Sequence, residues 1–202
     1  MRKVTLVLLG TLLLLVMTGC GKNKVSITAE DVTTNTLVIK EDNKVQSSIV
    51  EDFDKEYYSK EELEAFINEE VTDYNEKNGE DQIKMHSIHV ANQKASVVFN
   101  YNDIDDYSLF NGTNAKLLTT SQVLEADSSL STLEFVDAKS GDIVSSETAF
   151  SKESATVLVI QEPLDIKIDG TILYYSNAQK VDKGVLQADG EDITVVVFTK
   201  KK

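Results

Sequence analysis

The two histidines of the chain, His86 and His89, are the side chains best suited to bind a transition metal or to act as a general base. On a helix, their spacing would place both imidazoles on one face, where they could share a metal ion. The surrounding run Ile83–Val90 is instead typical of a β-strand, in which residues three apart point to opposite faces. We therefore expect no metal site, no cofactor and no catalytic role for either histidine.

A second group with possible chemistry is acidic and consists of Asp103, Asp105 and Asp106. Calcium prefers several oxygen ligands on a flexible loop, and an EF-hand loop needs glycine at its sixth position and glutamate at its twelfth. No alignment of this segment supplies both residues. The simpler interpretation is a solvated turn that caps the short segment Tyr107–Phe110.

The sequence motifs of the common enzyme classes are missing. The sequence contains no G-x-S-x-G elbow, no phosphate-binding or dinucleotide-binding glycine loop, no S-x-x-K pattern and no H-E-x-x-H pattern. Paired carboxylates could serve a glycosidase, but with 34 acidic residues such pairs arise by chance. The sequence therefore identifies no catalytic residue and favours a protein that is not an enzyme, although residues that converge only in the fold stay open as an alternative.

One long helix is predicted between residues 59 and 78. Ser59 is a suitable N-cap with Glu62 three residues later, and Asn78-Gly79 provides a suitable end. Apolar residues recur along one face at helical spacing: Leu63, Phe66, Ile67, Val71 and Tyr74. We expect this face to pack against a sheet.

The remaining segments predict short strands joined by turns. The expected strands are Leu37–Ile39, Val45–Val50, Ile83–Val90, Ala95–Tyr101, Leu117–Leu124, Thr132–Asp137, Ile143–Val144, Thr156–Ile160, Leu164–Ile168, Thr171–Tyr175, Gly184–Ala188 and Ile193–Phe198. Asp169-Gly170 and Asp189-Gly190-Glu191 are expected to be hairpin turns. The prediction is an α+β fold, a mainly antiparallel sheet with one long amphipathic helix packed on it. Residues 25–202 are expected to form a single domain, with 103–113 as a possible seam.

The first residues have the pattern of an export signal. Arg2 and Lys3 precede an apolar run that ends at Met17 and is too short for a permanent transmembrane helix. The run leads into Thr18-Gly19-Cys20, which resembles the lipobox of bacterial lipoproteins. This resemblance covers about the first twenty residues. It implies that residues 1–19 are a signal peptide, that Cys20 is the lipid attachment site and that residues 20–24 are a lipidated tether.

Cys20 is the only cysteine, so an intramolecular disulfide or a multi-cysteine metal site is excluded. Two or three acyl chains on this thiol would hold the protein in the membrane almost permanently. The formal net charge is −14, and it becomes −16 without residues 1–19, which contain two basic and no acidic side chains. Such a charge argues against nucleic acid as a partner and against a domain lying flat on anionic lipid. We expect the membrane to be contacted through the lipid anchor at Cys20.

Three functional hypotheses follow. The first is a lipoprotein on the extracytoplasmic side of the cell membrane that binds a partner protein or extracellular ligand without catalysis, similar in style to small surface lipoproteins of Gram-positive-type envelopes. The alternative is an extracytoplasmic hydrolase that acts on cell-wall or glycan substrates through carboxylates. A transport-system solute receptor ranks third, because such receptors are longer and built from alternating strands and helices.

Overall fold

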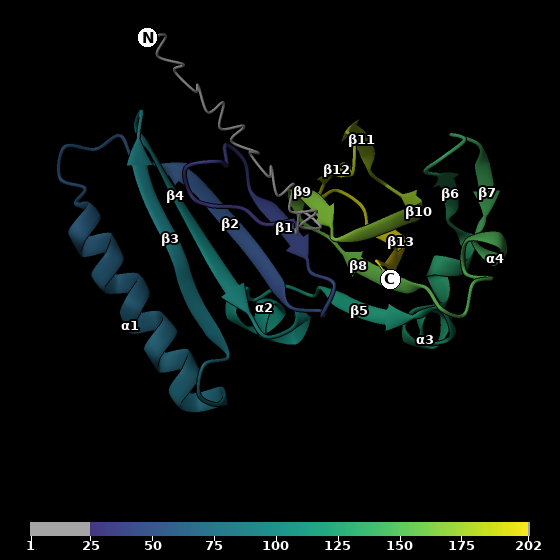
Figure 1. Cartoon of the computed structure of the whole chain (residues 1–202), viewed down its shortest axis with the longest axis horizontal. Coiled ribbons are helices and arrows are strands. Elements are labelled where there is room, and N and C mark those ends of the chain that lie inside the picture. Colours follow the sequence, from purple (N-terminus) through teal and green to yellow (C-terminus); the bar gives the residue numbers. More distant parts are fainter. Residues whose placement is uncertain (1–24, 202) are drawn as a thin grey trace, which may run out of the picture.

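The computed structural model describes residues 25–201, which fold into an α+β structure of two β-sheets and four α-helices (Figure 1). The seven-stranded sheet has the order β11-β12-β9-β1-β2-β4-β3, and the six-stranded sheet has the order β5-β8-β13-β10-β6-β7. The strands of the first sheet are β1 (Thr36–Ile39), β2 (Val45–Asp52), β3 (Ile83–Ala91), β4 (Lys94–Tyr101), β9 (Pro163–Ile168), β11 (Gln179–Asp182) and β12 (Val185–Asp189). Those of the second are β5 (Lys116–Thr119), β6 (Glu134–Asp137), β7 (Ile143–Ser145), β8 (Thr156–Ile160), β10 (Gly170–Ser176) and β13 (Thr194–Lys200). The helices are α1 (Lys60–Asn78), α2 (Ile104–Asn111), α3 (Thr120–Ala126) and α4 (Ser146–Ala149).

Alternating apolar residues give each sheet an inner and an outer face. In β1, Leu37 belongs to the central core cluster, whereas Val38 belongs to a separate cluster on the outer face. In β13, Phe198 points into the central cluster and Val197 into another outer cluster. The central cluster thus contains residues of both sheets, which pack face to face.

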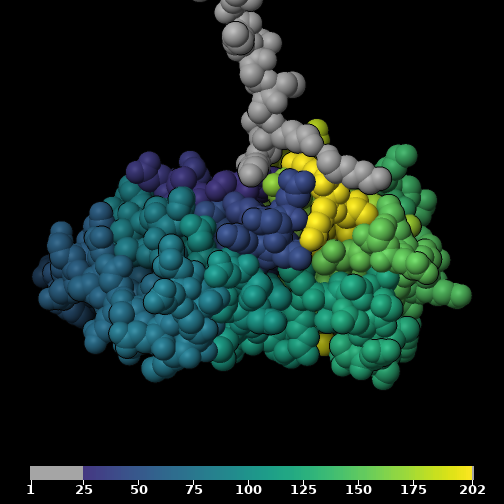
Figure 2. Space-filling model, turned by 60° about the horizontal axis from the view of Figure 1, so that its bottom comes forward, coloured from purple at the N-terminus to yellow at the C-terminus, as the bar shows by residue number. Residues whose placement is uncertain are grey.

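The inner face of the seven-stranded sheet has two different covers. The six-stranded sheet lies over the β12-β9-β1 half, and α1 and α2 lie over the β2-β4-β3 half (Figure 1). The outer face of the six-stranded sheet is covered by α3, α4 and the 3₁₀ helix Ser128–Thr132. The molecule is elongated, with the blue residues of α1 at one end and the green residues of α3 and α4 at the other (Figure 2). All residues of the three clusters lie between Val25 and Phe198, so residues 21–202 include the whole described core.

The α+β class, the long helix and most of the strands are confirmed, but the hairpin turns predicted at Asp169-Gly170 and Asp189-Gly190-Glu191 are wrong. Asp169-Gly170 connects β9 of the first sheet to β10 of the second. The Asp169 amide still donates to the carbonyl of Ile39 in β1, and its buried carboxylate accepts from Lys201 Nζ at 2.6 Å. A Cβ on Gly170 would lie 2.4 Å from the Thr199 carbonyl oxygen, so glycine is required here by a close backbone approach.

The second predicted turn also connects the two sheets. The turn 189–191 leads from β12 of the seven-stranded sheet to β13 of the six-stranded sheet. The pairing is also less uniform than predicted, because β1 and β9 run parallel. A tight turn fixes the local reversal of the chain, but it does not decide which sheet the next strand joins.

Short helices were missed. The predicted strand Leu117–Leu124 is a strand only to Thr119, after which the chain forms α3. The segment 103–113 contains α2, which connects β4 of one sheet to β5 of the other. Helices of this length show too few turns for a periodic pattern, and their start is set by a single capping residue, Asp103 for α2.

The ends of α1 agree with the prediction, but its buried face does not. The Ser59 hydroxyl accepts from the amide of Glu62 at 3.3 Å, and Gly79 follows the helix with φ of 124°. Ile67 and Tyr74 are buried, whereas the side chain of Phe66 is 59% exposed. The prediction that Phe66 packs against the sheet is therefore wrong. Helix α1 covers mainly the edge strand β3, so it buries a narrow stripe, and Phe66 lies about 100° around the helix from Ile67.

The adjacent residues Phe66 and Ile67 test this orientation of α1. We expect Ile67→Ala to lower the free energy of unfolding by about 2–5 kcal/mol, because it removes buried methyl groups and leaves a cavity. We expect Phe66→Ala to change it by less than about 0.5 kcal/mol, as for an exposed position. Urea unfolding of residues 21–202 measures both. Equal losses for the two variants would show that α1 is turned differently.

Candidate ligand-binding groove

An open groove with a volume of about 790 Å³ lies between α1, α2 and the inner face of β2 and β4. Helix α1 forms one wall, α2 forms the other, and the two strands form the floor. The lining residues are Ile49, Glu51, Phe53, Leu63, Phe66, Ile67, Glu70, Asp73, Tyr74, Lys77, Asn78, Ala95, Val97, Phe99, Leu109 and Phe110.

The groove is apolar in its floor and on both walls. Val97 and Phe99 of β4 form the buried floor together with the half-buried Ile49 of β2. Phe66 on one wall and Leu109 on the other are 59% and 64% exposed. Large apolar side chains that gather around a concave surface are typical of a binding site, whereas scattered single ones are not.

An aromatic cluster supports the end of the groove where α1 meets α2. The ring of Phe110 lies 5.5 Å from that of Tyr74, 5.6 Å from that of Phe99 and 6.2 Å from that of Tyr101. The Tyr74 pair has edge-to-face geometry, which is a favourable arrangement of two aromatic rings. These contacts hold α2 against the sheet and keep Leu109 at the rim.

A buried hydrogen bond joins the two helices beneath the groove. The Tyr74 hydroxyl donates to Asp106 Oδ1 at 2.9 Å, and Asp106 Oδ2 is buried with no hydrogen-bond partner. Burial raises the pKa of the Asp106 carboxyl above its ordinary value; the negative charges of Asp103 and Asp105 act in the same direction, and the bond from Tyr74 acts against them. Burial and the neighbouring Asp106 likewise raise the pKa of Tyr74.

A second tyrosine–carboxylate pair connects α2 to the segment between β8 and β9. The Tyr107 hydroxyl donates to Glu162 Oε2 at 2.9 Å. Burial raises the pKa of the Glu162 carboxyl, and the hydrogen bond from Tyr107 acts against this rise. Nearby, burial raises the pKa of Tyr101 to about 12. Neither Asp106 nor Glu162 lines the groove, so these carboxyls support its base and do not face a ligand.

A polar pocket of about 930 Å³ lies at the ends of β1, β2, β3 and β4. Its charged side chains have both signs and include Lys44, Lys84 and Asp81. Lys84 forms a salt bridge with Asp81 at 3.2 Å, and Lys40 Nζ donates to Gln46 Oε1 at 3.0 Å. Because its charges are mixed and partly engaged with each other, this pocket gives no clear chemical preference for a ligand.

The predicted strand Ile83–Val90 is confirmed as β3, but it is irregular at one of the two histidines. Strand β3 shifts register between Met85 and Ser87, so His86 occupies an irregular position and is exposed. His89 is half-buried opposite Ser96. In the part of the chain that the structure describes, no three residues of the types His, Cys, Asp and Glu are placed to hold a metal ion. The absence of a histidine metal site stays a prediction.

The structure separates the three acidic residues of the predicted turn. Asp103 is the N-cap of α2 and accepts from the amide of Asp106 at 2.9 Å, Asp105 is exposed, and Asp106 is buried against Tyr74. Cys20 and the signal segment lie outside the described residues. Among residues 25–201, no helix is both long enough and apolar enough to cross a membrane.

The groove itself was not predicted. Its exposed apolar residues, Phe66 and Leu109, resemble ordinary core positions in the sequence. The only signal for Phe66 was an apolar face of α1 wider than one edge strand can cover. Leu109 gave no signal, because α2 was not predicted.

The pair of Tyr74 and Asp106 predicts a pH dependence of stability. The raised pKa of the Asp106 carboxyl means that the folded chain binds the proton of this carboxyl more tightly than the unfolded chain does. Stability from this group is therefore highest below the ordinary value of 3.8 and falls as pH rises through the folded-state pKa. We expect Asp106→Asn to remove this part of the pH dependence in urea unfolding measured between pH 4 and 8.

The matched variant, Tyr74→Phe, removes the hydroxyl that donates the hydrogen bond and keeps the Asp106 carboxyl. Tyr74→Phe leaves the Asp106 carboxylate buried without a partner, so we expect a loss of about 1–3 kcal/mol at neutral pH. The loss should be smaller in acid, where the carboxyl is protonated. An equal loss at both pH values would show that the hydrogen bond does not act on the charged carboxylate.

The chain was compared with known proteins of three kinds. No protein-family model, no curated protein and no solved structure matches it. The geometry of the groove and the pattern of the first twenty residues are therefore the basis for a functional proposal.

Proposed function

We propose that this chain is a lipid-anchored, extracytoplasmic binding module whose ligand site is the groove between α1 and α2. The single observation that carries the proposal is the exposure of Phe66 and Leu109 on opposing walls above the apolar floor of β2 and β4. Apolar side chains that stay in water add little to the stability of the fold, and a ligand that covers them gains the free energy of their burial. The resemblance of Thr18-Gly19-Cys20 to a lipobox supports the proposed location.

A hydrolase is supported less well. The two carboxyls with a raised pKa, Asp106 and Glu162, each accept a hydrogen bond from a tyrosine, and neither lines the groove or the polar pocket. A general acid must reach the bond that is cleaved. For this reason the non-enzymatic binding module remains the proposal.

The groove is tested with Nile red, an uncharged dye that fluoresces in apolar sites. We expect residues 21–202 to bind the dye, and we expect Leu109→Asp to weaken binding at least tenfold, because it places a charge on the rim. Ile143→Asp is the matched control, since Ile143 is 69% exposed in β7 and outside the groove. If Ile143→Asp weakens binding as much as Leu109→Asp, or if the wild type binds no dye, the proposed site is wrong.

The anchor is tested separately in the full chain. In bacteria fed a labelled fatty acid, we expect the wild-type protein to carry the label and Cys20→Ala to lose it, because the thiol is the proposed acylation site. The variant should also keep its signal segment, which shows as a larger mass. Label retained by Cys20→Ala would refute the lipid anchor and leave the groove untouched.

A further inference from the structure

We infer that the groove takes an amphipathic α-helix of a partner protein, with an apolar face flanked by lysine or arginine side chains. This inference rests on the proposed function, because it assumes that the groove is the ligand site. It adds the class of ligand, its secondary structure and the sign of its charge.

The length of the groove fits a helix. Its lining residues on α1 extend from Leu63 to Asn78, which corresponds to about 22 Å at ~1.5 Å per residue. An occupant of about four helical turns would fill this length. Such a helix would present apolar side chains at spacings of three and four residues to Phe66, Leu109 and the floor.

The floor favours a helix over an extended peptide. Strand β2 lies between β1 and β4, and β4 lies between β2 and β3, so both floor strands are interior to the sheet. Their backbone groups are used within the sheet and cannot pair with an added strand. A peptide in an apolar groove must satisfy its own backbone N–H and C=O groups, and a helix does this internally.

The charge around the groove favours a basic occupant. Helix α1 contains seven acidic and two basic side chains, and α2 contains two acidic and no basic ones, whereas the whole chain has 34 acidic and 20 basic residues. The charged lining residues are Glu51, Glu70, Asp73 and Lys77. Lys77 Nζ lies 3.9 Å from Asp73 Oδ2, so these two side chains form a salt bridge. Within residues 25–201, neither Glu51 nor Glu70 belongs to a salt bridge.

The same charge disfavours two other apolar ligands. A fatty acid would bring a carboxylate close to Glu51 or Glu70, and an anionic lipid surface would be repelled by the acidic α1. Lysine and arginine flanks would instead meet these carboxylates and increase the rate of association. Positive charge is therefore part of the expected recognition.

Three synthetic 18-residue peptides test the inference. The first combines leucine and lysine, with leucines at helical spacing on one face. The second replaces lysine by glutamate, and the third is a scrambled leucine–lysine sequence without helical spacing. We expect residues 21–202 to bind the first at least tenfold more tightly than the other two in isothermal titration calorimetry, with binding that weakens as salt is added.

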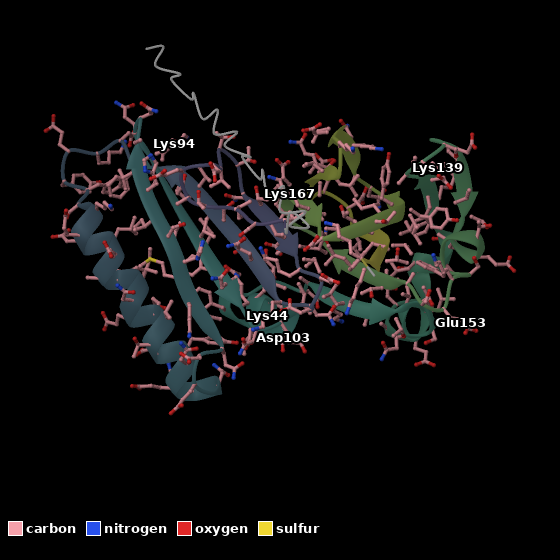
Figure 3. All side chains as sticks on the ribbon, viewed as in Figure 1. Lys44, Lys94, Asp103, Lys139, Glu153 and Lys167 are labelled. Carbon is pink, nitrogen blue, oxygen red and sulfur yellow. The ribbon has the colours of Figure 1, made fainter. Side chains whose placement is uncertain are left out.

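Variants locate the binding. The double variant Glu51→Lys, Glu70→Lys should weaken binding of the leucine–lysine peptide about tenfold, because two exposed attractions become repulsions. The matched control is Glu147→Lys, Glu153→Lys, which changes the net charge equally; Glu153 lies at the end of the molecule opposite α1 (Figure 3). Nile red binding by the wild type and by the control Glu147→Lys, Glu153→Lys should be the same, because neither control residue lines the groove.

Several results would overturn the inference. Equal binding of the leucine–glutamate peptide would refute the basic charge, and equal binding of the scrambled peptide would refute the helix. If both double variants weaken binding of the leucine–lysine peptide equally, the peptide recognises only the net charge of the protein. Displacement of Nile red by oleate or by phosphatidylcholine vesicles, with no peptide binding, would assign the groove to a lipid. In each case Nile red binding would still support the groove itself, so the two proposals fail separately.

Discussion

The structure depends on one wide apolar surface, the inner face of the seven-stranded sheet. The six-stranded sheet covers only the β12-β9-β1 half of this face, and the other half needs a different cover. Helix α1 reaches mainly the edge strand β3, and α2 packs at one end of the uncovered strands. The groove is the part of this face that no element of residues 25–201 fills, so it follows from how the two sheets are matched.

Polar contacts join α2 to α1 on one side and to a residue beside the six-stranded sheet on the other. Asp103 starts the helix, Tyr74 joins it to α1 through Asp106, and Tyr107 joins it to Glu162 beside the six-stranded sheet. One short helix thereby connects both covers of the inner face. Burying carboxyls costs free energy even when they accept a hydrogen bond, and their raised pKa values reflect that cost. The bond between Tyr74 and Asp106 joins the two helices that form the walls of the groove.

The sequence was informative where one local pattern determines the outcome. The N-cap Ser59 and the glycine at 79 set the ends of α1, and alternating apolar residues set the strands. It failed where the outcome depends on partners distant in the chain. Asp169-Gly170 has a turn sequence, but the chain continues into the other sheet, because β9 is held by β1 and β12 and β10 by β13 and β6. The exposure of Phe66 likewise depends on how few strands lie under α1.

The described chain begins on the side of the sheet opposite the groove. Val25 and Ile27 belong to the cluster on the outer face, with Val38 and Val98 from the central strands. Val97 and Phe99, the neighbours of Val98 in β4, face the groove, because side chains alternate along a strand. If Cys20 holds the membrane, the tether joins the domain on one face and a partner helix docks on the other. The sheet would then separate the anchor from the ligand, and a bound partner would not compete with the tether for the same surface.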